Sequence, residues 1–499
     1  MIDPRTPVLV GGGQWSNRVD DGAPAVEPVD LIAEALRRAA DDAGTGPAVL
    51  AAADAVWTVA MLSWRYTNPP ALVSERVGAS PRDTAVSALG GNAPHTLVNR
   101  ACREIASGNA DVILIGGAEA WRSQTTKGGK ALGWTREDDP RSAAVEPARR
   151  MDRDVPLNHQ AELACGIVWP TQFYALFEQA VRHAAGLGID EHMSRVSEMW
   201  ARFSRVAASN PHAWTCTALS AEQIRTPSAN NRWICWPYTK VMNANNAVEQ
   251  SAALIVMSAE RAEAACVARE RWVFPLAATE SQDHYAVSHR ADLASSPAIR
   301  AAGARLFHLA GSGLDEVGHI DLYSCFPSAV EVAARELGVS QDRDLTVTGG
   351  LSFAGGPWNN YVTHALATML GVLRAHPGSI GLVSGIGGYL TKHALGLYST
   401  EPPARGFRWE STHEHGDASP AREVLAPADR HAPHSGEIES WVVAFDREGA
   451  AETAFAAVLL DDGRRAWANT SDQDRLAELL SGAEQIGREA TIAPDGLLL

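Results

Sequence analysis

The sequence predicts an α/β protein of two similar halves, with a loop-rich lobe between them and a small β-rich domain at the C-terminal end. Two observations support this prediction. A unit of helix, strand and glycine pair occurs twice, at residues 92–117 and 359–388. Beyond about Thr400 the composition shifts to a segment rich in proline, histidine and charge, followed by short runs with strand and turn patterns.

The first half begins with a predicted strand at residues 7–11 and a helix, and continues with the strand "AVWTVAM". In the repeated unit, a helix with a single apolar face leads to a strand at 111–115, and its second copy leads to a strand at 380–384. The repeat lies far more than 50 residues away, which excludes a solenoid and favours two halves packed on each other. The apolar positions at helical spacing are Leu31, Ile32, Ala35, Leu36 and Ala39 in the first helix, Leu97, Val98, Ala101 and Ile105 in the first copy of the unit, and Val362, Leu366, Met369, Leu370 and Leu373 in the second.

The long tryptophan-rich span between the halves is too irregular for an ordinary connection and is expected to form a lobe over a ligand site. After it, a strand feeds a helix capped by Ser258, which returns the chain to the first half. We therefore expect a first half at 1–117 and 241–265, a lobe at 118–240, a second half at 266–400, a linker at 401–436 and a β-rich, barrel-like domain at 437–499.

Composition excludes several classes of function. Lys and Arg number 43 against 59 Asp and Glu, a net charge of −16, and no basic stripe is present, so nucleic acid is not an expected partner. No apolar run approaches the ~18 residues of a membrane span, and the N-terminus has no signal-peptide pattern, so we expect a cytoplasmic protein without a membrane partner. The six cysteines lack metal-ligand spacing, so no metal site is predicted.

Four segments carry a family resemblance: "SGNADVILIGGAEA", "YTKVMNANNAVEQSAALIVMSAE", "DLYSCFPSA" and "GGLSFAGGP". Over about residues 1–400 they resemble the thiolase superfamily, most closely the lipid-carrier-type, acetyl-CoA acetyltransferase-like thiolases and their thiolase-like relatives with an additional C-terminal domain. The resemblance implies the five-layer thiolase fold. It also implies a CoA thioester as ligand or substrate in lipid or acyl-CoA metabolism, with no bound cofactor.

The catalytic positions of that family are changed in this chain. By the family's spacing, the nucleophilic cysteine falls on Gly91, the histidine of Gly-His-Pro on Gly356 and the second cysteine on Gly385. Cys102 is no substitute, because it lies 11 residues beyond Gly91, about 16 Å along a helix. The resemblance thus implies a cavity that still binds an acyl thioester without thiolysis. Its expected binding residues are Gly91, Asn92, Gly356, Trp358, Asn359 and Gly385.

Two residues offer replacement chemistry. Tyr323 occupies the position of the family's His or Asn in the third loop, as in thiolase-like aldol lyases that use tyrosine hydroxyls, and His95 is expected one turn into the helix that starts near Gly91, at the pocket mouth. Three hypotheses stay open: a binding protein, an aldol lyase or acyltransferase that uses Tyr323 and His95, and an ordinary thiolase or ketoacyl synthase whose cysteine aligns elsewhere. Monomer and homodimer also stay open, because "RDTAVSALGG", the segment through which thiolases pair, is less apolar than such an interface requires.

Overall fold

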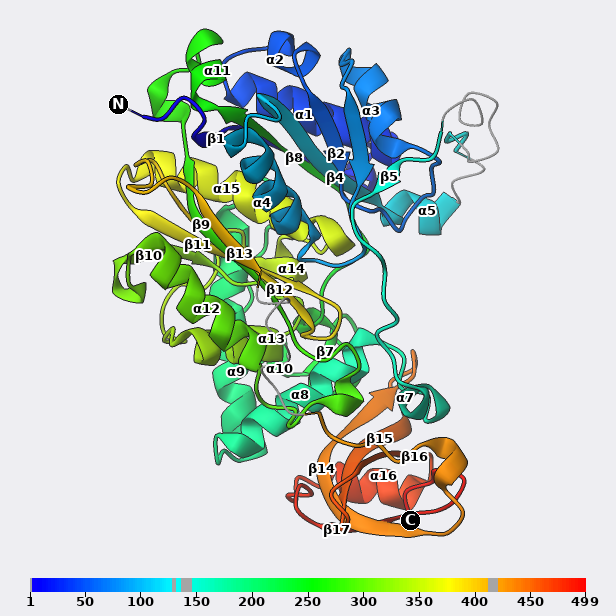
Figure 1. The fold of residues 1–499 in the computed structure, drawn as a ribbon. Coiled ribbons are helices and arrows are strands. Elements are labelled where there is room, and N and C mark those ends of the chain that lie inside the picture. Colours follow the sequence, from blue (N-terminus) through cyan, green and yellow to red (C-terminus); the bar gives the residue numbers. More distant parts are fainter. Residues whose placement is uncertain (1, 128–131, 136–145, 412–420) are drawn as a thin grey trace.

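The computed structural model describes residues 2–127, 132–135, 146–411 and 421–499. These residues form three sheets. One sheet lies in each of the two α/β halves, and the third lies at the C-terminal end, shown in orange and red in Figure 1.

The first sheet combines the start of the chain with a strand from far downstream. Strand β8 pairs antiparallel with both β1 and β4, while β4, β2, β3 and β5 run parallel to one another. The order across the sheet is β1 (Pro7–Ser16), β8 (Glu249–Ser258), β4 (Val112–Ala120), β2 (Ala55–Thr58), β3 (Asp83–Val86) and β5 (Arg149–Arg150). The helices around it are α1 (Pro28–Asp42), α2 (Pro47–Ala51), α3 (Pro69–Val77), α4 (Ala93–Ala106) and α11 (Ala259–Ala264).

The first strand is longer than the five residues expected from the sequence. It runs through the three glycines at 11–13, because α1 packs directly on its backbone there. A Cβ on Gly13 would lie 2.5 Å from the backbone nitrogen of Ala39, which is too close for any side chain. Only glycine, which has no Cβ, fits at this position. The glycines therefore permit close helix-to-strand packing inside the strand and do not end it.

The second sheet has the order β10 (Val317–Asp321), β11 (Ile380–Gly387), β12 (Lys392–Ser399), β9 (Phe274–Gln282) and β13 (Arg408–Ser411). Helices α12 (Pro297–Ala310) and α13 (Pro327–Leu337) pack together beside it, and α14 (Gly350–Phe353) and α15 (Tyr361–Ala375) follow. Helices α4 and α15 contact each other and strands of both sheets, so they form a central layer between the two sheets. The N-terminal end of α4 is therefore placed deep between the halves.

The lobe consists mainly of helices. They are α5 (Trp121–Lys127), α7 (Gln160–Ala164), α8 (Pro170–Ala184), α9 (Ile189–Ser209) and α10 (Ala221–Arg225), with strands β6 (Trp233–Trp236) and β7 (Tyr238–Thr239). Short 3-10 helices are η1 (Val19–Asp21), η2 (Lys240–Met242), η3 (Arg269–Arg271), η4 (Val287–His289), η5 (Leu314–Glu316), η6 (Trp358–Asn360) and η8 (Pro427–Asp429). Within the described residues, no helix combines the length and apolar character needed to cross a membrane.

The C-terminal sheet is not confined to the end of the chain, because β6 and β7 of the lobe extend it beside β14. Its other elements are β14 (His434–Phe445), β15 (Ala451–Leu460), β16 (Arg465–Thr470), β17 (Glu489–Ile492) and α16 (Gln473–Leu479). The expectation of a plain linker at 401–436 is wrong in part: β13 pairs with β9 of the second sheet, and β14 already begins at His434. The segment 412–420 of that linker lies outside the described residues.

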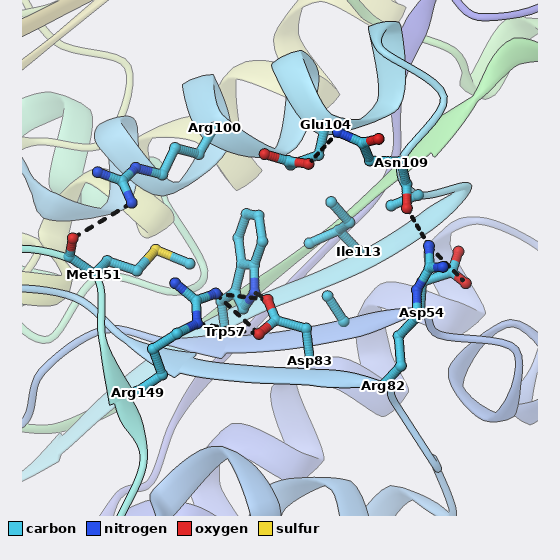
Figure 2. A pocket seen from close by; sticks show the side chains of 12 residues that line it. Asp54, Trp57, Arg82, Asp83, Arg100, Glu104, Asn109, Ile113, Arg149 and Met151 are labelled. Atoms are coloured by element: carbon cyan, nitrogen blue, oxygen red, sulfur yellow. Dashed lines mark hydrogen bonds and ion pairs between the residues drawn. The ribbon is translucent and has the colours of Figure 1, made fainter.

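The outer edge of the first sheet is covered by the chain itself. Strand β5 lies beside β3, and the guanidinium of Arg149 donates to both carboxylate oxygens of Asp83 at 2.7–3.2 Å, while Trp57 Nε1 donates to the same carboxylate at 2.8 Å (Figure 2). The hollow beside these residues measures about 270 Å³. Its arginines are engaged by carboxylates: Arg149 by Asp83, Arg82 by Asp54 and Arg100 by Asp152. Glu104 accepts from Asn109 Nδ2 at 2.9 Å, so each charged group described in this hollow already has a partner.

Candidate functional site

A cavity of about 500 Å³ opens where the N-terminal ends of α4, α8 and α13 converge with the β11–β12 turn. Trp169, the N-cap of α8, is 64 % exposed and forms part of its mouth with Val168, Leu62 and Leu89. Most of its wall is apolar or aromatic. The wall also includes Gly90, Gly91, Leu157, Pro170, Thr171, Tyr174, Asn243, Ala244, Asn246, Tyr323, Cys325, Phe326, Leu351, Trp358, Asn359, Ile386, Gly388 and Tyr389.

Gly91 and Tyr323 meet in the wall of this cavity. A Cβ added to Gly91 would overlap the Tyr323 hydroxyl and would lie 2.5 Å from the carbonyl oxygen of Ile386. The tyrosine hydroxyl therefore occupies the space into which a side chain at position 91 would extend. The structure brings together these two residues, which the sequence had singled out separately.

The ring of Tyr323 is held from behind. Its backbone N–H donates to Ser384 Oγ at 2.8 Å, and its ring packs edge-on against Tyr361, with 5.5 Å between the centroids. The Tyr361 hydroxyl in turn donates to the buried carboxylate of Asp321 at 2.9 Å. Because each partner is fixed by the next, the Tyr323 hydroxyl is held in one place at the cavity wall.

The ionisable groups of the cavity are all poor bases at neutral pH. Burial raises the pKa of Tyr323 well above its usual 10, and the neighbouring Cys325 raises it further. Burial also raises the pKa values of Tyr174 and Tyr389, and it raises that of the Cys325 thiol to about 12. Among the described residues that line the cavity there is no Asp, Glu, His, Lys or Arg. The wall therefore offers neutral hydrogen-bond donors and acceptors.

The other two glycines lie near the cavity. A Cβ on Gly356 would lie 2.9 Å from Asn246 Oδ1, and one on Gly385 would lie 3.0 Å from the Cα of Asn92. Gly385 is thus packed against the segment that leads into α4, and Gly356 against the 243–246 segment of the wall. Neither has room for a histidine or cysteine side chain without movement of these neighbours.

The remaining predicted binding residues divide between two places. Trp358 and Asn359 line the cavity, but the amide of Asn359 is occupied: it accepts from the N–H of Gly90 at 2.9 Å and donates to the carbonyl of Ala60 at 2.8 Å. Asn92 does not line this cavity and lies in a neighbouring hollow. Asn359 therefore fixes the loop that carries Gly91.

His95 is not at the pocket mouth, where the sequence placed it. Its side chain is fully buried, packs beside Tyr398 and faces Gly396. Burial lowers the pKa of its imidazole to about 4. The expectation that His95 lies at the pocket mouth is therefore wrong. Its side chain extends from α4 toward the second sheet, away from the cavity.

Sequence reasoning missed Asn243, which the structure places in the wall. Its Oδ1 atom and the indole Nε1 of Trp358 are buried without a hydrogen-bond partner among the described residues. The sequence signal was present in "NANN", a run of short amides between two strands. Only the fold shows that Asn243 and Asn246 line the cavity while Asn245 does not.

A second feature that the sequence did not indicate is a buried cluster of Glu178, His192 and Glu331, whose possible ligand atoms all lie within 4.8 Å of one another. His192 Nε2 is hydrogen-bonded to Glu178, and the Tyr238 hydroxyl donates to the same carboxylate at 2.5 Å. The imidazole is thus engaged by protein groups, and the cluster is accounted for as a buried hydrogen-bonded cluster that ties α8, α9 and α13 together.

Comparison with known proteins identifies the family. The crystal structure of a monomeric SCP2-thiolase-like protein type 1 from Mycobacterium smegmatis is 32 % identical to this chain, with a TM-score of 0.84, and the match covers 100 % of both chains. The chain belongs to the SCP2-thiolase-like protein type 1 family. Residues 416–497 also match the family described as the thiolase-like protein type 1 additional C-terminal domain.

More distant structures share the fold of this type 1 thiolase-like protein. The Ltp2-ChsH2(DUF35) aldolase is 20 % identical with a TM-score of 0.59, over 79 % of this chain and 98 % of that one. An acetyl-CoA acetyltransferase from Syntrophomonas wolfei is 15 % identical with a TM-score of 0.56, over 79 % and 99 %. These two likenesses concern the thiolase fold alone. The expected resemblance to thiolase-like proteins with an added C-terminal domain is confirmed.

Proposed function

We propose that this type 1 thiolase-like protein binds an acyl-CoA, or a related acyl thioester, in the central cavity and does not carry out thiolysis. One observation carries the proposal: the wall holds no carboxylate, imidazole or amine among its described residues, and its one thiol has a raised pKa. Thiolysis requires a thiolate nucleophile and a group that exchanges protons near neutral pH. A cavity with only neutral donors and acceptors is suited to hold a ligand.

The shape and polarity of the wall support an acyl thioester as that ligand. Apolar side chains suit the acyl chain. The unpartnered Asn243 Oδ1 can accept a hydrogen bond from a hydroxyl or amide N–H of the ligand. The unpartnered indole Nε1 of Trp358 can donate one to a carbonyl of the ligand. A role in lipid or acyl-CoA metabolism follows from such a ligand.

An aldol lyase that uses Tyr323 is the second candidate, and the position of its hydroxyl beside Gly91 favours it. Carbon–carbon cleavage of a 3-hydroxyacyl thioester requires removal of the hydroxyl proton and a donor to the enolate oxygen. With its raised pKa, the Tyr323 hydroxyl is suited to the donor role and poorly suited to the base role. We therefore place binding first.

The test compares ligand retention with turnover. The purified protein is incubated with CoA plus a 3-ketoacyl-CoA, and separately with a 3-hydroxyacyl-CoA, and bound ligand and new products are measured by mass spectrometry. We expect retained acyl-CoA and no new product. Cleavage of the hydroxy thioester that disappears in Tyr323→Phe would replace the proposal with the lyase, and covalent acylation of a cysteine would contradict both.

A pair of variants locates the bound ligand. Asn243→Ala removes the unpartnered acceptor, and we expect it to weaken acyl-CoA binding about tenfold, the value of roughly one hydrogen bond. Asn245→Ala changes a neighbouring amide that does not line the cavity and is expected to leave the Kd unchanged. Equal affinity of both variants and the native protein, measured by calorimetry, would place the ligand elsewhere.

A further inference from the structure

Beside the central cavity lies a second hollow of about 490 Å³, here called the side hollow, between α4, the 152–155 segment and strands of the second sheet. Leu89 lines both spaces. Asn92, which directly follows Gly91, and Lys392 of β12, whose ammonium donates to the carbonyl of Leu89, line the side hollow. The two spaces are therefore neighbours on either side of the loop that enters α4.

The charge of the side hollow is opposite in sign to that of the chain. Arg100, Arg103, Arg153 and Lys392 line it, in a protein of net charge −16. Arg100 pairs with Asp152 at 2.9 Å. Within the described ranges, no carboxylate lies at ion-pair distance from the other three cations.

The acidic groups in its wall are already engaged. The Glu280 carboxylate accepts from Asn99 Nδ2 at 2.9 Å and from the indole of Trp409 at 3.1 Å. Asp154, which lies close to Lys392 but does not line the hollow, accepts from the N–H of Leu89 at 2.7 Å and pairs with Arg150. Arg100, Arg103, Arg153 and Lys392 line the hollow against the carboxylates of Asp152 and Glu280, so the net charge of its described lining is positive.

Two buried polar atoms of the same wall lack partners. Asn92 Oδ1 and Thr96 Oγ1, one turn apart at the start of α4, have no hydrogen-bond partner among the described residues. The threonine hydroxyl can donate to an anion. In addition, Arg103 is held over the ring of Trp409, with 4.2 Å between its Cζ atom and the ring centroid, so its guanidinium is preoriented.

We propose that the side hollow binds the anionic end of the thioester whose acyl part occupies the central cavity. The inference rests on the proposed function. Three cations without an ion-pair partner and an unpartnered hydroxyl, all among the described residues, suit a negatively charged group. Leu89 borders both spaces and is exposed, so a single ligand would pass over it from one space to the other. The negative charge has two possible sources: the phosphates of the CoA nucleotide, or a carboxylate at the far end of the acyl group.

Three probes distinguish these sources in a calorimetric experiment on the full chain: a plain acyl-CoA, the same acyl group on pantetheine, and an acyl-pantetheine with a terminal carboxylate. The test variant is Arg103→Gln/Arg153→Gln. The control is Arg195→Gln, an exposed arginine of α9 that pairs with Glu191 outside both spaces.

We expect the test variant to weaken binding of at least one charged probe about tenfold and to leave plain acyl-pantetheine unchanged. Loss for acyl-CoA alone assigns the side hollow to the nucleotide, and loss for the carboxylate probe alone assigns it to the acyl end. If the test variant binds all three probes as the native protein does, the inference is overturned while the proposed function stands. If the native protein binds none of them, both fail.

Discussion

Replacing Gly91 with alanine tests whether the Tyr323 hydroxyl fills the space into which a side chain at position 91 would extend. The backbone at Gly91 is not left-handed, so only space opposes a side chain. The new Cβ would meet the Tyr323 hydroxyl and the Ile386 carbonyl oxygen at distances well below the 3.0 Å that real Cβ atoms respect. Because Tyr323 is braced by Tyr361 and the carbonyl belongs to β11, neither can withdraw freely.

We expect Gly91→Ala to lower the free energy of unfolding by about 1–3 kcal/mol, the usual cost of overpacking a dense core. Urea unfolding followed by tryptophan fluorescence measures this change. Gly371→Ala is the matched control: that glycine lies on α15 with open space around its missing Cβ, so alanine should stabilise the helix by about 0.5–1 kcal/mol.

A double variant separates the two obstacles. Tyr323→Ala removes the ring but leaves the Ile386 carbonyl, so Gly91→Ala/Tyr323→Ala should be less destabilised than the sum of the single variants by about 1 kcal/mol. If Gly91→Ala were as stable as the native protein, or if the two effects were simply additive, the position of Tyr323 described above would be wrong.

Three further outcomes are expected. The buried imidazole of His95 has a pKa of about 4 in the folded protein, whereas in the unfolded chain it takes up a proton below the usual pKa of 6.5. The folded protein therefore loses stability as the pH falls from 6.5 toward 4. In urea titrations, the free energy of unfolding of His95→Phe should fall by about 2 kcal/mol less than that of the native protein between pH 6.5 and 5. Arg465→Ala should cost about 3–5 kcal/mol and speed limited proteolysis of the C-terminal domain, because this buried arginine pairs with Glu439 and donates to three carbonyls of the second half. The neighbouring Arg464 is partly exposed and pairs with Asp462, so Arg464→Ala should cost under about 1 kcal/mol; equal effects of the two variants would refute this assignment. Because β5 covers the free edge of β3, light scattering should give the monomer mass of 53.2 kDa, and twice that mass would contradict it.

Much of the fold was accessible from the sequence, because helix and strand periodicities are local signals. The duplicated unit gave both central helices and both glycine-ended strands, and the family resemblance placed them in a thiolase fold. Where packing overrides local pattern, the expectations failed. The first strand was predicted to end at residue 11, yet it continues through the glycines at 12 and 13, where α1 packs on its backbone.

The candidate site was predicted only in part. Spacing located Gly91 and Tyr323 separately, but their contact joins residues more than 200 positions apart and depends on how the two halves pack. His95 has a side chain suited to proton transfer and lies close to Gly91 along the chain, so the sequence indicated a catalytic role for it. Its direction on α4 is set by the second sheet, which buries it.

The sequence by itself shows glycine at 91, 356 and 385, the positions that the resemblance assigns to the family's cysteine and histidine side chains, because residue identity is read directly from the chain. The tertiary structure alone decided what surrounds these glycines. It placed the Tyr323 hydroxyl where a side chain at position 91 would extend. Among the described residues it left Asn243 and Trp358 with unpartnered atoms and gathered three cations without an ion-pair partner in the next hollow. The physical reason is that a site consists of surfaces from distant segments, and only packing determines which of them meet.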